Sequence, residues 1–582
     1  MKRLSIKILS FAMSLFILAG SSACSKGEEG SASAGTENTS KTGSTDNSPI
    51  TISVEGLIGG KQNGVQKDDV SKYIAQKTGI SINTLNVPDG AGSTEKYSAQ
   101  LASGDLPDIF FNIFPIKKIV DADQIYALDD LVAKYGKNLN ADPKGKAMIE
   151  ANKLLSPDGK LYTIGMDRGT WDNGTGATRG IYIRWDLYKK LGYPEIKDLD
   201  GLTDVLINMQ KLEPKTKDGK KTYVLGSCNG PQDLDFDIFI GALRTQGLVE
   251  HEPDFITYID NSTRRPSSSN ILKDKNSIFW KCYKNANKLY RLGLFDPDSF
   301  TQSGDQRAAK KDAGTYMCIN ASWDASGLND KFQKDGETDK GMVALPASAF
   351  GFDNYQLYEN TPTGERNYCI SKNCKNPERA MQLLDFVSTY EFSRIANDGL
   401  EGSNWTLVNG IPTPTKEYLN RTSEEAEASQ QKTGAGYYSH FCGYKSGTIE
   451  PSTKTSVNCL YSYRANHPTA VQKDFVDHFG VKTMPEVYQK DVKMYSSETV
   501  VDWGILSDDM TNYQSNFLTF KVQSEAKIIM AKTDAEFAKA QDDFIKGMNA
   551  YKVDDLYKFF TDNANASADK MEPVYQLLDS DK

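Results

Sequence analysis

Apolar and polar positions divide the chain into three zones. Residues 8–20 form an almost unbroken apolar run. Residues 25–49 contain no Val, Ile, Leu, Phe, Tyr or Trp, so this stretch has nothing with which to build a core. From residue 50 onward, apolar runs typical of strands take turns with stretches of helical period. The pattern therefore predicts a short leader, a polar linker and a large folded body.

The body begins with a regular succession of elements. The apolar spacing predicts strands and helices in alternation, at 50–57, 68–78, 80–87, 93–103 and 108–112. Strand, helix, strand, helix, strand is the pattern of a parallel α/β sheet. Ligands of such sheets bind beyond the carboxyl ends of the strands. Asn112, which ends the third strand, is therefore expected at the edge of a ligand site.

The leader has the features of a secretory signal. Lys2, Arg3 and Lys7 precede the apolar run, and residues 21–23 are small. The run has 13 residues, whereas a membrane-spanning helix needs ~20. We therefore expect residues 1–23 to act as a cleaved targeting segment.

The end of the leader resembles a bacterial lipoprotein signal, in which the cysteine becomes the lipidated first residue of the mature protein. Cys24 would be that residue, carrying acyl groups such as palmitate. The family pattern usually has Leu, Val or Ile three positions earlier, where this chain has Ser21, so ordinary cleavage near Ala23 remains the alternative. Lipidation is favoured because residues 24–49 would form a flexible tether. The resemblance implies a body anchored at the extracellular face of a bacterial, Gram-positive cell membrane.

Length and composition limit the number of domains and the classes of partner that the protein can bind. The body of about 530 residues exceeds what one core supports, so two or more domains are expected. The net charge of −9 and the pI of about 5.3 argue against nucleic acid as a partner. Tyr and Phe number 29 and 25. These rings either pack the core or form platforms for a ligand with apolar faces, such as a sugar.

Cysteine and histidine give no sign of a metal site or of a cofactor. Seven cysteines remain if Cys24 is lipidated. Cys369 and Cys374 are close enough in sequence to pair, and buried free thiols are the alternative. The four histidines are scattered without zinc-type spacing.

Several segments resemble those of extracellular solute-binding proteins (family 1 type) that serve ABC importers. The first is LASGDLPDIFFN, at 101–112. The others follow in the family's order at 161–166, 181–202, 318–323, 375–391, 399–405, 526–530 and 534–548. They are most similar to the large Gram-positive lipoproteins that bind oligosaccharides.

The resemblance implies an α/β fold of two lobes with a ligand cleft between them and several crossings. Lobe one would comprise 50–160 with a return segment near 330–390. Lobe two would comprise 165–320 and about 391–582. Large members of the family often carry a calcium loop that corresponds to 213–223 here. Lysines stand where oxygen ligands would be needed, so we expect a plain turn at 218–219 and no bound metal.

Candidate ligand residues combine aromatic rings with planar polar groups. Trp171 and Asp172 lie in a glycine-rich stretch, and Trp323 and Asp324 follow an apolar run. Trp405 follows a predicted helix. Each tryptophan could instead pack against the body.

Two further candidates flank the third predicted strand, namely Asp108 and Asn112. Arg168 and Arg179 stand near the glycine-rich stretch, where they would suit an anionic sugar such as a uronate.

These features predict a monomeric substrate-binding lipoprotein that passes an oligosaccharide to the permease subunits of an ABC transporter. No catalytic residue is assigned. A surface polysaccharide hydrolase is the alternative from another class, since 77 acidic residues could supply its two carboxylates. A peptide-binding member of the same fold is the other alternative.

Overall fold

The computed structural model describes residues 47–56, 63–86, 91–170, 179–230, 233–250, 256–350, 355–358, 360–489, 492–495 and 497–580. Asn47 to Lys582 form one compact unit. The predicted signal segment, Cys24 and most of the tether lie outside the described residues. None of the described helices combines the length and apolar character that a membrane span requires.

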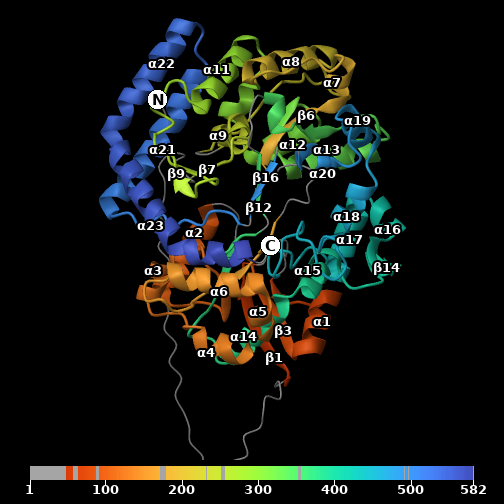
Figure 1. Cartoon of the computed structure of the whole chain (residues 1–582), viewed down its shortest axis with the longest axis vertical. Helices are drawn as coiled ribbons and strands as arrows, with labels where there is room; N and C mark the ends of the chain where they lie inside the picture. The colour runs from red at the N-terminus through yellow and green to blue at the C-terminus, as the bar shows by residue number, and fades with distance from the viewer. Residues whose placement is uncertain are drawn as a thin grey trace, which may run out of the picture. The chain divides into compact units, whose positions relative to one another are not determined.

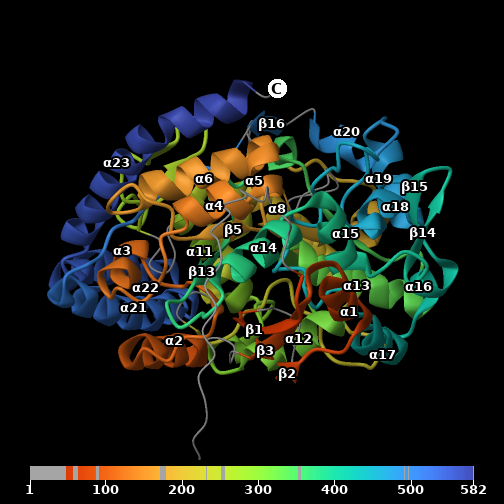
Figure 2. The same ribbon diagram turned by 90° about the horizontal axis from the view of Figure 1, so that it is seen from below.

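The first sheet has six strands in the order β2-β3-β1-β4-β13-β5 (Figures 1 and 2). Their bounds are β1 Ile50–Glu55, β2 Gly64–Val65, β3 Ile80–Leu85, β4 Ile109–Phe111, β5 Ile164–Met166 and β13 Arg366–Ile370. β1 pairs in parallel with β3 and β4, while β13 runs antiparallel to β4 and β5. The predicted parallel order of the strands at 50–57, 80–87 and 108–112 is therefore confirmed.

The helices that precede β3 and β4 end where the sequence predicts, and the second of them begins two residues before its predicted start. α1 (Asp69–Thr78) is capped by the Asp68 side chain, which accepts a hydrogen bond from the Ser71 amide at 2.8 Å. It stops at Gly79, whose φ of 72° is the left-handed conformation that glycine adopts at little cost. α2 spans Ala91–Ser103.

The first core lies against this sheet. It combines apolar side chains of β1, β3 and α1 with those of α14 (Pro377–Val387) and α15 (Tyr390–Asp398). Phe392, Ile395 and Phe441 belong to it as well. The chain after residue 390, assigned to lobe two from the sequence, thus contributes to the first core as far as Cys442.

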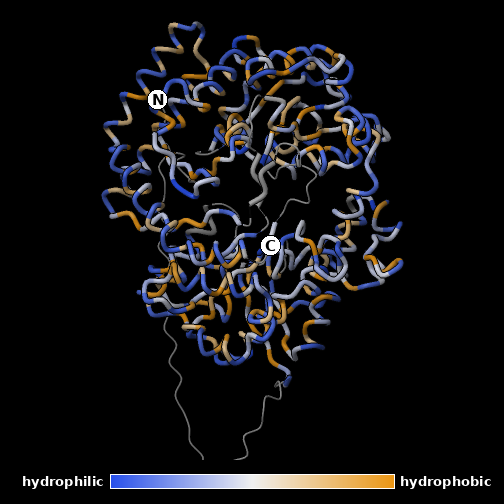
Figure 3. The backbone as a smooth tube through the Cα atoms, viewed as in Figure 1, coloured by the Kyte–Doolittle hydropathy of each residue, from blue (hydrophilic) through white to orange (hydrophobic). Residues whose placement is uncertain are grey.

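The second sheet has three antiparallel strands in the order β10-β6-β11. These are β6 Arg179–Arg184, β10 Cys318–Ala321 and β11 Met342–Ala344. Among the helices whose side chains join the second core are α8 (Leu199–Leu212), α9 (Asp233–Ile238), α11 (Ile278–Arg291), α13 (Ser322–Lys334), α21 (Asp508–Ile529) and α22 (Asp534–Gly547). Figure 3 shows hydrophobic and hydrophilic residues interleaved along these helices, as expected when one face is buried.

The last helix contacts the second core and a smaller, separate apolar cluster. α23 (Val553–Ser580) places Val553, Leu556 and Phe560 in the second core. Farther along, its apolar side chains pack on Ala147 and Ala151 of α6 (Pro143–Leu155). Figures 1 and 2 both show the blue end of α23 running beside the orange α6. One helix therefore extends from the second core to α6, whose Met148 and Ile149 belong to the first core.

Candidate functional site

The carboxyl ends of β1, β4 and β5 and the start of β13 lie at one edge of the first sheet, because β1, β4 and β5 run in one direction and β13 runs in the opposite one. We call this the first edge. Glu55 ends β1, Asn112 follows β4, Asp167 follows β5 and Arg366 begins β13. Polar residues from distant parts of the sequence therefore lie at this edge.

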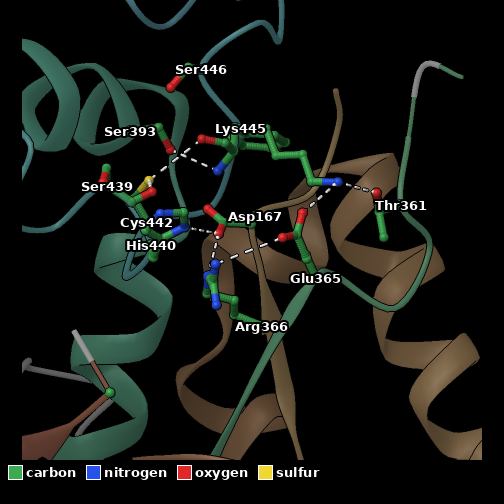
Figure 4. A network of polar contacts seen from close by, with 12 residues as sticks. Asp167, Thr361, Glu365, Arg366, Ser393, Ser439, His440, Cys442, Lys445 and Ser446 are labelled. Atoms are coloured by element: carbon green, nitrogen blue, oxygen red, sulfur yellow. Dashed lines mark hydrogen bonds and ion pairs between the residues drawn. The ribbon is translucent and has the colours of Figure 1, made fainter. Parts of the chain in front are cut away.

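Asp167 is the centre of the first edge (Figure 4). Its carboxylate is fully buried, and Oδ2 accepts from His440 Nδ1 at 2.8 Å and from Arg366 Nε at 3.2 Å. Its backbone has a φ of 54°, and its amide donates to the Cys442 carbonyl at 3.0 Å. The contacts join the end of β5, the start of β13 and the loop around residue 440.

A second ion pair lies beside this one. Lys445 is almost fully buried, and its Nζ donates to Thr361 Oγ1 at 2.7 Å and contacts Glu365 Oε2 at 3.1 Å (Figure 4). Its amide donates to the Arg168 carbonyl at 2.9 Å. The loop that carries His440 is thus fixed to the sheet at two positions.

At the end of β1, two buried oxygen atoms have no hydrogen-bond partner in the described structure. They are Glu55 Oε2 and Tyr97 Oη. The other carboxylate oxygen of Glu55 pairs with Lys96. Burial, and then the charge of Glu55, raise the pKa of Tyr97 above its ordinary value, so the phenol keeps its proton. A Cβ at Gly56 would lie 2.5 Å from Phe111 Cβ, so glycine is required at this corner.

An aromatic pair stands at the edge of the second sheet, which we call the second edge. Trp323 follows β10 and is 50% exposed. Its ring centroid lies 6.0 Å from that of Phe236 in α9. The Arg179 guanidinium lies 4.9 Å from the Phe236 centroid and pairs with Glu250 at 2.5 Å. Phe236 therefore packs against the Arg179 guanidinium, while half of the Trp323 surface remains open to solvent.

The other residues predicted to bind the ligand lie in different parts of the chain. Asp324 pairs with Lys311 beside Trp323. Asn112 lies at the first edge, and its Oδ1 accepts from the Phe114 amide at 2.9 Å, which forms a turn. Trp171 and Asp172 lie outside the described residues.

Two predicted residues have structural roles away from these edges. Asp108 precedes β4, at the opposite end of the strand, where Oδ2 accepts from the Ser53 amide at 2.8 Å and from Ser53 Oγ at 2.7 Å. Trp405 begins β14 (Trp405–Val408) and is 8% exposed. Its Nε1 donates to the Gly399 carbonyl at 2.8 Å. Both side chains hold the fold together, and we do not place them in the candidate site.

The two arginines expected to suit an anionic sugar are engaged within the protein. Arg168 is fully buried and donates to the carbonyls of Gly165 and Ser388, each at 2.8 Å. Arg179 pairs with Glu250. The expectation of two available arginines is therefore wrong.

Sequence reasoning missed Glu55, Asp167, Arg366 and His440. Asp167 had a usable signal, because it directly follows a predicted strand. Glu55 lies inside an apolar run and looked like part of the core. Arg366 and His440 come from distant segments that carry no motif.

The described cysteines are seven buried free thiols. Burial raises the pKa of Cys282 to about 12, so this thiol stays protonated. The sequence left a disulfide between Cys369 and Cys374 and buried free thiols as alternatives, and the structure contains the free thiols. The predicted turn near residue 218 is confirmed, with Gly219 at a φ of 83° and its amide donating to the Thr216 carbonyl at 2.9 Å.

Comparison with known proteins identifies a family and a relative of this chain. The profile of the family described as bacterial extracellular solute-binding protein matches residues 62–391. Lipoprotein LipO of Bacillus subtilis (strain 168) is 23% identical over 407 residues, which cover 65% of this chain and 72% of LipO.

Solved structures resemble the chain over most of its length. The alginate-binding protein AlgQ2, in a structure without calcium ion, has a TM-score of 0.59 at 16% identity and covers 90% of this chain and 99% of its own. An HMO-binding, ABC-transporter-associated solute-binding protein from Bifidobacterium longum infantis ATCC 15697 has a TM-score of 0.58 at 16% identity. The match covers 89% of this chain and 99% of that protein. These likenesses confirm the predicted two-lobed α/β fold.

Proposed function

The chain belongs to the family of bacterial extracellular solute-binding proteins, and from this premise we propose that it captures an oligosaccharide between its two lobes and delivers it to the permease subunits of an ABC transporter. The observation that carries the proposal is the half-exposed Trp323 beside Phe236. Sugar rings have apolar faces that stack on aromatic side chains, and polar groups then bind the hydroxyls. Similar structures described as alginate-binding and HMO-binding support this ligand class.

The proposed mechanism is closure of two lobes. A ligand that contacts both the first and the second edge binds the closed state more tightly than the open state, and so shifts the population toward closure. The closed form then docks on the permease. In this proposal the protein binds and releases its ligand without making or breaking a bond.

The proposed location follows from the leader. We propose that residues 1–23 are removed, that Cys24 is lipidated and that residues 24–49 tether a monomeric body to the extracellular face of a Gram-positive cell membrane. The similarity to a protein described as a lipoprotein supports this arrangement.

The test is a thermal-shift screen of residues 24–582 carrying Cys24→Ser, with an oligosaccharide panel and peptides as controls. A saturable rise in melting temperature for one sugar class is the expected result, because a ligand that binds only the native state stabilises it. A rise with peptides alone would leave a solute-binding protein but remove the oligosaccharide.

A parallel assay for reducing ends, with polysaccharides and the oligosaccharides that bind, separates binding from hydrolysis. No new reducing ends are expected. Their release in proportion to protein concentration would overturn the binding proposal in favour of the hydrolase.

A further inference from the structure

One helix beside the second edge contacts the sequence neighbours of both aromatic rings. α12 (Gly304–Asp312) begins with a capping box, in which the Ser303 amide donates to Gln306 Oε1 at 2.9 Å. Arg307 and Lys311 follow in this helix, four positions apart. Residues at that spacing lie on one face of a helix, so the two cations can act together.

Arg307 holds the residue that follows the first ring. Asp237 comes directly after Phe236 in α9, and its buried Oδ2 accepts a hydrogen bond from Arg307 Nη1. Burial raises the pKa of Asp237, and the positive charge of Arg307 opposes this rise. On the other side of Phe236, the fully buried Asp235 pairs with Lys521 of α21. The ring is therefore flanked in sequence by two anchored carboxyl groups.

Lys311 holds the residue that follows the second ring. It is 4% exposed, and its Nζ donates to Oδ2 of Asp324, which comes directly after Trp323. The same Nζ lies 3.8 Å from Oδ1 of Asp237. The N-cap residue of α13 is Ala321, which offers no side-chain acceptor to the first turn. The Lys311 ammonium therefore connects the first turn of α13 with α9.

We infer that Arg307 and Lys311 are positioning residues for the pair of rings at the second edge. They hold α9 and the first turn of α13 at a fixed separation, and so fix the two rings, whose planes meet at 42°. A surface that is already ordered before binding loses less freedom when a sugar stacks on it. This inference rests on the proposed function and extends it to two residues that act through the rings.

Lys311→Met tests the inference, because methionine has a similar length and no charge. The probe is the oligosaccharide, from a panel of neutral and uronate sugars, that gives the largest saturable thermal shift. Its affinity is measured by calorimetry with residues 24–582 carrying Cys24→Ser. We expect Lys311→Met to weaken it about tenfold, because binding groups must be held close to their productive geometry.

Lys310→Met is the matched control in the same helix. Lys310 Nζ donates to Asp296 at 2.7 Å and to Asp298 at 2.8 Å, and neither aspartate adjoins one of the two rings. Asp296 is fully buried, so this variant should lower the melting temperature at least as much as Lys311→Met does. Its affinity for the sugar should change by less than about twofold, since the two sites share no partner.

A double-mutant cycle separates positioning from a general effect on the fold. If Lys311 acts through the ring of Trp323, the effect of Lys311→Met should shrink to less than about twofold in a Trp323→Ala background. Arg307→Met supplies a second test should Lys311→Met fail to fold. It should weaken binding as well, and Arg307→Lys, which keeps the charge, should restore most of the affinity.

The outcomes distinguish this inference from the proposed function. Parental affinity in a folded methionine variant of Arg307 or Lys311 would overturn the inference and leave the oligosaccharide proposal intact. A tenfold loss that persists in the Trp323→Ala background would also overturn it. Failure of the parent protein to bind every sugar of the panel would overturn the proposed function together with this inference.

Discussion

The ring centroids of Trp323 and Phe236 lie 6.0 Å apart, and half of the Trp323 surface remains exposed. A large apolar side chain that is open to solvent beside a second ring provides a ready surface for a ligand. Because Trp323 contributes little to the core, its removal should affect binding far more than folding.

We therefore predict that Trp323→Ala weakens the affinity for the sugar by at least about 30-fold, the effect of losing about 2 kcal/mol at a central aromatic contact. The melting temperature of the free protein should change little. Calorimetric titration and a thermal scan measure the two quantities.

Trp503→Ala is the matched control, since Trp503 is also partly exposed but packs against Phe560 of α23. It should keep the affinity of the parent protein. Equal loss of affinity in both variants would point to a general effect on the fold and contradict a platform at Trp323.

The buried carboxylate of Asp167 gives the next prediction. Asp167→Asn keeps a side chain that tolerates a φ of 54°, but it removes the charge that pairs with Arg366 and His440. Breaking a buried pair typically costs about 3 kcal/mol. We expect a loss of this size in the free energy of unfolding, measured with urea, and weaker binding.

Asp123→Asn is the control for this variant. Asp123 has nearly the same φ, 53°, but its side chain is 87% exposed and pairs with Lys372 at the surface. An exposed pair contributes at most about 1 kcal/mol. If both variants lost the same free energy of unfolding, the buried pairs of Asp167 would contribute no more to stability than an exposed pair does.

A third prediction concerns pH and Asp398. Burial raises the pKa of this carboxyl to about 7, although the Cys459 amide donates to Oδ2 at 2.8 Å. The native state therefore holds a proton that the unfolded state releases near pH 4, so this group favours folding at low pH and loses that contribution as the pH rises toward 7.

We expect the free energy of unfolding of the parent protein to fall more steeply between pH 5 and 7.5 than that of Asp398→Asn. Urea titrations at intervals of half a pH unit measure the two slopes. Asp335→Asn serves as the control, because Lys331 holds the pKa of Asp335 below its ordinary value and outside this range. Parallel slopes for the parent and Asp398→Asn would contradict the assignment.

The succession of elements could be predicted because it depends on local pattern. The α1 cap at Asp68 and its stop at Gly79 are local signals, and so is the strand after each helix. Trp323 could be found for the same reason, since a tryptophan after an apolar run stands at a strand end.

The first edge could not be predicted in this way. Asp167 and His440 lie 273 positions apart, and their contact depends on the path of the chain through β13 and α15. Asp108 shows the converse case. It flanks the predicted strand, but the strand direction places it at the end where Ser53 is its partner.

The last prediction concerns the thiols. Cys369 and Cys374, the pair that could have formed a local disulfide, are both buried as free thiols, 0% and 3% exposed. Because the thiolate is the nucleophile that attacks a thiol reagent, and burial raises the pKa of these groups, the native protein carrying Cys24→Ser should react negligibly with an aromatic disulfide reagent. After unfolding in guanidinium without reductant, all seven thiols should react. Five reactive thiols under those conditions would show that two cysteines are joined in a disulfide and would contradict the free state of the pair.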